Sequence, residues 1–272
     1  MAAQGAENKV TVLVLAASRA GPDDAVAALQ GVSHKCLVEI DGEVMLQRVV
    51  RQIAESEHTG RIYVSIESED IIRKVPLLAH MMDEGRLHFL PSSDNLFNSV
   101  MAGARAIPDP LPLMVSAGDN ALHTPAMVDY FAKAVLDGSM DAAVGMTPAE
   151  TILAAYPDGK RAFHELKDGG WSSCNLYAAK TERALKAARV FETGGQFGKR
   201  PSRILKAFGA RFMLMYKFRL ASLQGMADYL SKRWEIDVQP VVMPFADAPI
   251  DVDNPGDFKR TEAILKQRRG AA

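Results

Sequence analysis

The sequence predicts an α/β sandwich built on a mostly parallel sheet. Short apolar segments of strand type alternate with segments whose apolar residues recur at helical spacing. The first apolar segment is hydrophobic on both faces, as expected for a strand that helices cover on both sides. Alternation of this kind is typical of βαβ units, and 272 residues suffice for one large α/β domain or two small ones.

Residues 10–17 (VTVLVLAA) predict the central first strand, because the segment is short, rich in β-branched residues and followed by Ser, Arg and Gly. Further strands of the first half are expected at 61–66, 87–90, 112–116 and 140–146. Helices are expected between them at 45–54, 95–106 and 125–136. The last of these has a clear start, since Thr124 can cap a helix and Pro125 suits the first helical position.

The pattern changes after residue 150. The sequence predicts a strand at 172–178, a helix at 182–191, a glycine-rich turn at 193–198, a largely helical stretch at 201–232, a strand at 238–243, a loop at 246–254 and a final helix at 255–267. Gly209 and Gly225 break the helical stretch and are expected at helix ends. We therefore expect one catalytic domain over residues 1–272, with a helical insertion at about 180–233.

Composition excludes several classes of protein. Hydrophobic residues make up 48% of the chain, and 32 Lys and Arg balance 33 Asp and Glu, so disorder, collagen and a disulfide scaffold are excluded. The longest apolar run is far shorter than the roughly 20 residues that span a bilayer. The N-terminus lacks a signal-peptide layout, and Cys36 and Cys174 indicate unpaired thiols in a reducing compartment. We expect a cytoplasmic protein without stable membrane insertion.

The net charge of -1 conceals an uneven distribution. Residues 180–219 contain eleven Lys or Arg and two acidic residues, a net of +9, so the remainder carries -10. A local basic segment favours an anionic small molecule over a long polyanion, although a solvated helical surface is the open alternative. Without an RNA-binding motif, nucleic-acid binding is not expected. An oligomer remains possible.

The loop after the first strand, residues 18–34, carries the most information. Ligands of parallel sheets bind beyond the C-terminal ends of strands, where loop N–H groups commonly meet phosphates. This loop contains Arg19 and Gly21 and leads to Lys35. It has neither a GxGxxG nor a Walker A sequence, which counts against Rossmann-type dinucleotide binding and P-loop hydrolysis.

Three blocks in this order resemble the NTP transferases related to molybdenum-cofactor guanylyltransferase. LVLAASRAG and HKCLVEIDGEVMLQRVV resemble the family's LAAGxGxRMG, PKxL and GxPML-type segments. SAGDNALHTP (116–125) resembles its GDxPxxxP block, and IDVDNPGDF (250–258) its NTPEDL block. The resemblance implies a Rossmann-like fold of the nucleotide-diphospho-sugar transferase (GT-A) type. It also implies transfer of NMP from an NTP to a phosphorylated small-molecule acceptor, with release of pyrophosphate.

By motif position, the resemblance assigns phosphate binding to the first strand and its loop. Lys35 would contact the α-phosphate and stabilise the charge that develops there, and Arg19 would hold the β- and γ-phosphates. The surrounding nucleotide-binding segment comprises Leu15, Ala16, Ala17 and Ser18. A plain surface lysine is the alternative for Lys35, but its place between a long loop and an apolar turn favours the functional interpretation.

The resemblance also assigns a Mg²⁺ site to Asp119 and Asp253. Magnesium suits this chemistry because it takes oxygen ligands from one or two carboxylates and from substrate phosphates. Asp251 competes with Asp253 for this role, and Asp257 is expected as a first-turn acid of the last helix. Asp119 could instead only cap a turn.

The sequence departs from the family pattern at the phosphate loop. Ser18 stands where the family has glycine, His34 replaces the proline before Lys35, and the loop is unusually long. These departures motivate a second hypothesis, a nucleotide-binding or regulatory protein that has lost catalysis. A glycosyltransferase of the same fold is a third; it would need an acidic DxD after a mid-chain strand, where this chain has GDN.

The resemblance makes weaker assignments to the acceptor and the base. Asn175, in GGWSSCNLY, is a candidate acceptor contact, with a turn residue as the alternative. The basic side chains after the glycine-rich turn are candidates for an acceptor phosphate: Lys199, Arg200 and Arg203. Asn95 is a candidate for the nucleobase, with helix capping nearby as the alternative. The apolar stretch 208–230 indicates a lipid or bulky-acceptor contact or, more commonly, a buried helical hairpin.

Overall fold

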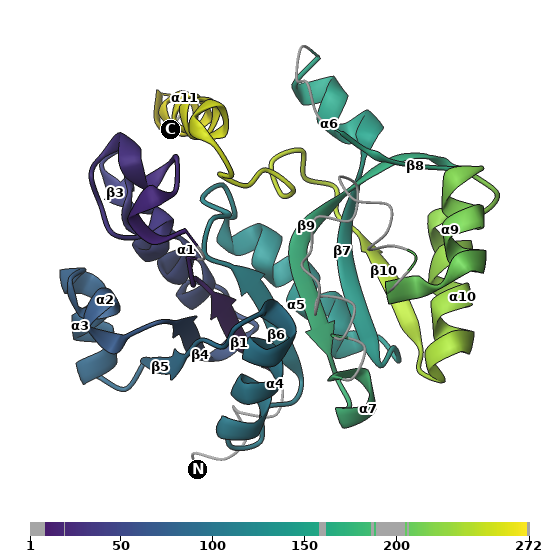
Figure 1. Ribbon diagram of the computed structural model, residues 1–272, viewed down its shortest axis with the longest axis horizontal. Helices are drawn as coiled ribbons and strands as arrows, with labels where there is room; N and C mark the ends of the chain where they lie inside the picture. The colour runs from purple at the N-terminus through teal and green to yellow at the C-terminus, as the bar shows by residue number, and fades with distance from the viewer. Residues whose placement is uncertain are drawn as a thin grey trace.

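The computed structural model describes residues 9–18, 20–157, 162–185, 188, 205 and 207–270 (Figure 1). Its centre is one sheet with the strand order β10-β7-β9-β6-β1-β4-β5, to which β8 adds by pairing with β9. The strands are β1 (Val10–Leu15), β4 (Thr59–Ile66), β5 (Leu87–Pro91), β6 (Leu113–Ala117), β7 (Ala142–Pro148), β8 (His164–Leu166), β9 (Gly169–Ala179) and β10 (Val238–Val242). A separate hairpin joins β2 (Glu39–Ile40) to β3 (Glu43–Val44).

Only the pairings of β9 are antiparallel within this large sheet, so the predicted α/β class with a mostly parallel sheet is confirmed. The helices are α1 (Met45–Ala54), α2 (Glu69–Arg73), α3 (Pro76–Asp83), α4 (Leu96–Ala106), α5 (Pro125–Asp137), α6 (Ala149–Ala155), α7 (Glu182–Leu185), α9 (Ala210–Lys217), α10 (Leu223–Trp234) and α11 (Pro255–Gly270). In Figure 1, α9 and α10 stand beyond β10 at one end of the sheet, and α2 and α3 stand beyond β5 at the other. No described helix is both long and apolar enough to cross a bilayer.

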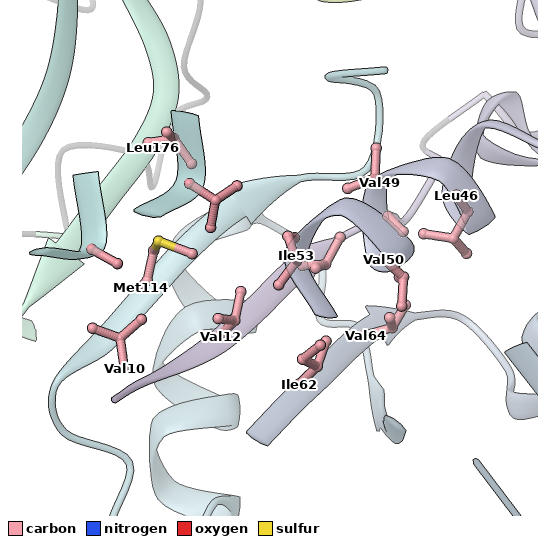
Figure 2. Close-up of a cluster of buried hydrophobic side chains, with 14 of the residues drawn as sticks. Val10, Val12, Leu46, Val49, Val50, Ile53, Ile62, Val64, Met114 and Leu176 are labelled. Atoms are coloured by element: carbon pink, nitrogen blue, oxygen red, sulfur yellow. The ribbon is translucent and has the colours of Figure 1, made fainter. Parts of the chain in front are cut away.

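Strand β1 is buried on both faces, which explains its uninterrupted apolar sequence. On one face, Val10, Val12 and Val14 belong to a buried cluster with side chains of α1 and α5. Figure 2 shows the α1 part of this cluster, with Val12 and Ile53 labelled. On the other face, Leu13 packs against Val100 of α4. Helices on both sides of the sheet make the expected α/β/α sandwich.

The predicted elements of the first half lie within a few residues of the observed ones. Helix α1 has the predicted bounds, and the Thr124 side chain accepts from the Met127 N–H at the start of α5, as expected. One prediction is wrong: Gly225 does not end a helix but lies in the first turn of α10. Ser222 caps that helix by accepting from the Gly225 N–H at 3.1 Å, so the cap decides the boundary.

Gly209, by contrast, lies at the start of α9, as expected, with φ of 88°. The helix predicted at 182–191 is described over Glu182–Leu185 as α7. The glycine-rich turn predicted at 193–198 lies outside the described residues.

Candidate functional site

The C-terminal ends of three neighbouring parallel strands meet at one edge of the sheet. Leu15 of β1 pairs with Ser65 of β4 and with Ala117 of β6, so the loops that follow these strands begin at the same level. Gly118 makes the closest approach: its N–H donates to the Leu15 carbonyl at 2.9 Å, and a Cβ on it would lie 3.0 Å from the Ala16 Cβ. Glycine before Asp119 therefore lets the two loops touch.

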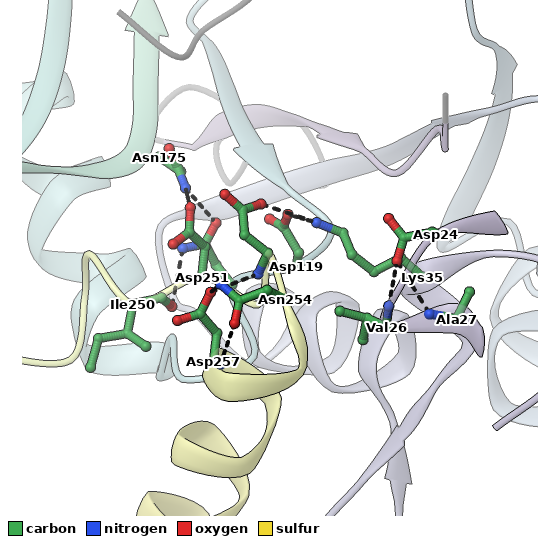
Figure 3. A network of polar contacts seen from close by, with 12 residues as sticks. Asp24, Val26, Ala27, Lys35, Asp119, Asn175, Ile250, Asp251, Asn254 and Asp257 are labelled. Atoms are coloured by element: carbon green, nitrogen blue, oxygen red, sulfur yellow. Dashed lines mark hydrogen bonds and ion pairs between the residues drawn. The ribbon is translucent and has the colours of Figure 1, made fainter. Parts of the chain in front are cut away.

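Lys35 reaches this edge from a short 3₁₀ turn, Lys35–Leu37, that follows the first loop. Its Nζ lies 2.6 Å from Asp119 Oδ2 and 3.4 Å from Asp253 Oδ1 (Figure 3). Burial lowers the pKa of the Lys35 ammonium, but the two carboxylates raise it by more, so the net pKa lies above the ordinary lysine value. Lys35 is therefore a fixed positive charge at neutral pH.

Asp119 leaves half of its carboxylate without a partner. Oδ2 binds Lys35, whereas Oδ1 is buried and makes no hydrogen bond. The main chain of Asp119 is fixed from the other end of the protein, because its carbonyl accepts from the Val252 N–H at 3.1 Å. A buried carboxylate oxygen without a donor is costly, so the free oxygen indicates a place for a cationic ligand.

Asp253 reaches Lys35 from the loop before α11. Its N–H donates to Asp257 Oδ2 at 3.3 Å, and Asp257 lies in the first helical turn as predicted. The Asp253 side chain is 40% exposed, compared with 19% for Asp119. The two carboxylates thus differ in exposure: Asp119 is largely buried, whereas Asp253 is open to solvent.

Asn175 lies beside this pair on β9, at an irregularity in its pairing with β7. Its φ of 54° is in the left-handed region, which asparagine tolerates better than most residues. The amide Nδ2 donates to Asn120 Oδ1 and to Asp251 Oδ2, both at 3.2 Å (Figure 3). The irregularity in the strand therefore places the Asn175 amide against the Asp251 carboxylate. Asp251 thus orients Asn175, whereas Asp119 and Asp253 are the carboxylates that contact Lys35.

Two residues that depart from the family pattern, Ser18 and His34, make specific contacts at the two ends of the first loop. The Ser18 Oγ accepts from the Gly21 N–H at 3.0 Å and closes the turn, a contact that glycine could not make. The Ser18 N–H donates to Glu67 Oε1 at 2.7 Å, and His34 Nε2 lies 3.3 Å from Glu67 Oε2. A carboxylate therefore accepts from a backbone N–H of the loop to which the resemblance assigns phosphate binding.

Sequence reasoning did not find Glu67. It follows the last residue of β4, Ile66, and its place at the C-terminal end of a strand next to β1 is the signal that could have pointed to it. Glu67 is one of three acidic residues in the segment IESED, which matches no motif. Its contact with Ser18 arises from strand order, which the sequence does not specify.

A cavity of about 890 Å³ opens onto these groups. Most of the described site candidates line it: Leu15, Ala16, Ala17, Ser18, Lys35, Asp119, Asn175 and Asp253. Asn95 does not; it caps α4 by accepting from the Asn98 N–H at 2.8 Å, and its neighbour Leu96 lines the cavity instead. A nucleobase role for Asn95 stays a prediction. Arg19, Lys199, Arg200 and Arg203 lie outside the described residues.

Asp119 and Asp253 are the carboxylates of the predicted Mg²⁺ site. The described part of the chain holds no group of three or more His, Cys, Asp and Glu side chains suited to a metal. Mg²⁺, however, needs only one or two carboxylates when substrate phosphates complete its shell. The unpartnered oxygen of Asp119 and the exposed carboxylate of Asp253 fit that requirement.

The chain combines a mostly parallel Rossmann-like sheet with a cation and carboxylates at the C-terminal edge of that sheet, and its family model is one of the nucleotidyltransferase class. A family model described as the MobA-like NTP transferase domain matches residues 12–189. The chain belongs to this family, and the resemblance is confirmed. A comparison with curated proteins returns no match.

Solved structures share the fold along nearly the whole chain. A hypothetical transferase from Thermus thermophilus has 20% identity and a TM-score of 0.68, covering 92% of this chain and 99% of its own. A 4-diphosphocytidyl-2C-methyl-D-erythritol synthase from Anaerococcus prevotii has 12% identity and a TM-score of 0.57, covering 96% and 97%. A nucleotidyl transferase from Methanothermobacter thermautotrophicus has 13% identity and a TM-score of 0.52, covering 96% and 99%.

Proposed function

We propose that the protein is a Mg²⁺-dependent nucleotidyltransferase that transfers NMP from an NTP to a phosphorylated small molecule and releases pyrophosphate. One observation carries the proposal: carboxylate oxygens of Asp119 and Asp253, which come from distant segments of the chain, both lie within 3.4 Å of Lys35 Nζ. Membership of the MobA-like NTP transferase family supports this class of reaction. We propose a single domain over 1–272, with the helical insertion at about 180–233 on the acceptor side.

The reaction requires positioning and charge neutralisation more than covalent chemistry. An acceptor phosphate oxygen attacks the α-phosphorus in line, and the bond between that phosphorus and the pyrophosphate oxygen breaks. Lys35, which stays charged, would move from Asp119 towards the α-phosphate and stabilise the transition state. Bound Mg²⁺ would neutralise charge on the triphosphate.

The remaining residues would bind and orient the substrates. The backbone of Ala17 and Ser18 would receive the β- and γ-phosphates, with help from Arg19. Asn175, whose amide is held by Asp251, would contact the acceptor. The acceptor phosphate would be further neutralised by Lys199, Arg200 and Arg203, which come from the +9 segment.

A second candidate is a protein that binds NTP without catalysis. The contact of the Ser18 N–H with Glu67 favours it, because a carboxylate then stands where the triphosphate would lie. A pyrophosphate-release assay with phosphomonoester acceptors separates the two functions. Binding of NTP and Mg²⁺ without pyrophosphate release from any acceptor would support the non-catalytic protein.

A thermal-shift screen of the four NTPs with Mg²⁺ tests the binding step first. A ligand at 100 times its Kd adds about 2.7 kcal/mol to the free energy of unfolding. For a chain of this size, that gain raises the Tm by roughly 5–10 °C. We expect one NTP to produce this shift in the wild type and a smaller one in Lys35→Ala and Asp119→Asn. Equal shifts in all three proteins would contradict the site.

A further inference from the structure

The cavity that opens at Lys35 extends well beyond the carboxylates. Its described lining contains five Asp, Glu, Lys or Arg side chains, and all belong to the polar end: Asp24, Lys35, Asp119, Asp251 and Asp253. Further in, it runs between the sheet and the hairpin formed by α9 and α10. The lining there includes Val144, Met146, Phe212, Met226, Leu230 and Trp234. We call this part the apolar end.

The few polar side chains near the apolar end bind one another. The Tyr216 hydroxyl lies 3.0 Å from His164 Nδ1, and the Tyr177 hydroxyl lies 3.0 Å from Ser173 Oγ. Pairing of this kind leaves little capacity to recognise the hydroxyl groups of a sugar, which need donors and acceptors aimed at them. The wall therefore presents mainly hydrocarbon and aromatic surface to a ligand.

The hairpin packs on the sheet and also lines the cavity: Leu230 and Trp234 pack with Ala142 and Ala179, and Met226 packs with Leu166 of β8. Phe208 and Phe212 stack with ring centroids 4.5 Å apart, and Phe212 also contacts Tyr229. The small residues Ala142 of β7 and Ala227 of α10 line the cavity between the sheet and the hairpin. The apolar end is part of the single cavity of about 890 Å³ that also includes the polar end, and its aromatic, aliphatic and small side chains offer an apolar surface to a ligand group.

We propose that the acceptor is the phosphomonoester of a large apolar alcohol. This inference rests on the proposed function and specifies its acceptor. The acceptor phosphate would lie near Lys35 and Asn175, and its hydrocarbon or aromatic part would fill the apolar end. A phosphate oxygen would form the new bond to the α-phosphorus while the bond to pyrophosphate breaks, which gives a nucleoside diphosphate ester of the alcohol and pyrophosphate.

Direct binding of n-alkyl phosphates tests the proposal without requiring turnover. Isothermal calorimetry of ethyl, butyl, hexyl and octyl phosphate, with Mg²⁺ and a non-hydrolysable NTP analogue, measures the Kd of each. We expect the Kd to fall by about threefold to fourfold per added methylene, the factor expected for a buried CH₂ group. A Kd that does not depend on chain length would overturn the inference. Loss of pyrophosphate release with chain-length dependence intact would count against the proposed function alone.

Three variants sharpen this measurement. Ala227→Phe fills the apolar end and should weaken octyl phosphate at least tenfold while leaving ethyl phosphate unchanged. Lys232→Leu, on the exposed side of the same helix, is the matched control and should change neither. If Ala227→Phe does not fold, Met226→Ala enlarges the same space and should shift the preference to branched chains. Unchanged octyl phosphate binding in folded Ala227→Phe would overturn the inference.

A second arm identifies the source of the apolar group. Leu214, Phe218 and Leu220 are exposed on and just after α9, which suggests comparing a micellar or vesicular acceptor with a free one. Transfer to octyl phosphate below its micelle concentration would indicate a free acceptor. Transfer only to long-chain alkyl phosphates in neutral phospholipid vesicles would indicate a lipid. A hexose phosphate that outperforms both would overturn the inference.

Discussion

The two ends of the cavity are built on different principles. At the polar end, loops that follow neighbouring strands are fixed to one another by main-chain contacts, such as the Gly118 N–H to the Leu15 carbonyl and the Val252 N–H to the Asp119 carbonyl. At the apolar end, side chains of α9 and α10 that pack on the sheet also line the cavity. The difference suggests that the polar end holds reacting groups in a fixed geometry, whereas the apolar end selects the acceptor by its shape and hydrophobicity.

The largest expected effect belongs to Lys35. Lys35→Met removes the positive charge that stabilises the transition state, so kcat for pyrophosphate release should fall by about 10²–10³, the usual effect of losing one such group. The chain-length dependence of acceptor binding should survive, because the apolar end is untouched. Stopped assays of pyrophosphate and calorimetry measure the two properties.

Lys133→Ala is the control for Lys35→Met. Lys133 is an exposed lysine of α5 that pairs with Asp137. Its loss should leave kcat and acceptor binding unchanged. A Lys35→Met enzyme with wild-type turnover would remove Lys35 from the reaction.

Much of the polar end could be predicted from the sequence. Lys35, Asp119 and Asp253 lie in ordered blocks whose spacing reflects strand ends, and the structure brings all three together. Asn175 was found from its segment, but the bulge that aims it depends on how β9 pairs with β7. Glu67 was missed because strand order, not a motif, brings it to Ser18.

The apolar end could be predicted only as two alternatives. The apolar stretch at 208–230 is compatible with a buried hairpin or with a ligand contact, since both need the same hydrophobic spacing. Which side chains face a cavity depends on the packing of α10 on β10. Gly225 was assigned to a helix end because glycine breaks helices on average, whereas the Ser222 cap sets the boundary here.

A smaller effect than that of Lys35 is expected at Asn175, where two variants separate the role of the backbone conformation from the role of the side-chain amide. Both Asn175→Gly and Asn175→Ala remove the amide that binds Asp251 and should lower kcat/KM about equally, by roughly tenfold for a lost charge-assisted hydrogen bond. Alanine at a φ of 54° costs about 1 kcal/mol more in stability than glycine.

Urea unfolding and steady-state kinetics of the two variants check this separation. If the alanine variant lost activity and the glycine variant kept it, the backbone would matter and the amide would not.

A smaller effect is expected at Glu67. Its carboxylate occupies the Ser18 N–H and would repel a triphosphate, so Glu67→Gln should lower the KM for NTP by roughly threefold, as expected for a weak repulsion at an exposed site. The kcat should stay unchanged. Kinetics at two salt concentrations give the measurement, and a raised KM would show that Glu67 orders the loop instead.

The smallest effect concerns His123, a buried residue near Asp119. Burial lowers its pKa, although hydrogen bonds to backbone and the charge of Asp119 oppose this and Arg268 reinforces it. The unfolded chain therefore binds a proton near pH 6.5 that the native protein resists, so stability is full above that pH and declines below it.

His123→Gln should remove this contribution while keeping a donor for the Ala248 carbonyl. Between pH 6.5 and 5, the free energy of unfolding should fall more steeply in the wild type, by at most about 1.4 kcal/mol per pH unit. Denaturant titrations across this range measure both slopes. If the free energy of unfolding fell equally with pH in the wild type and in His123→Gln, the lowered pKa of His123 would make no contribution to stability.

The most direct test of the central claim follows the α-phosphorus. The protein is incubated with Mg²⁺, an NTP labelled at the α-phosphate and an alkyl phosphate, and the products are separated. We expect the label to move into a nucleoside diphosphate ester of the acceptor and unlabelled pyrophosphate to form, with transfer at least 100-fold slower in Asp119→Asn, as expected when a group that positions the transition state is lost. Label that remains in the NTP, or equal transfer by wild type and Asp119→Asn, would contradict nucleotidyl transfer at this site.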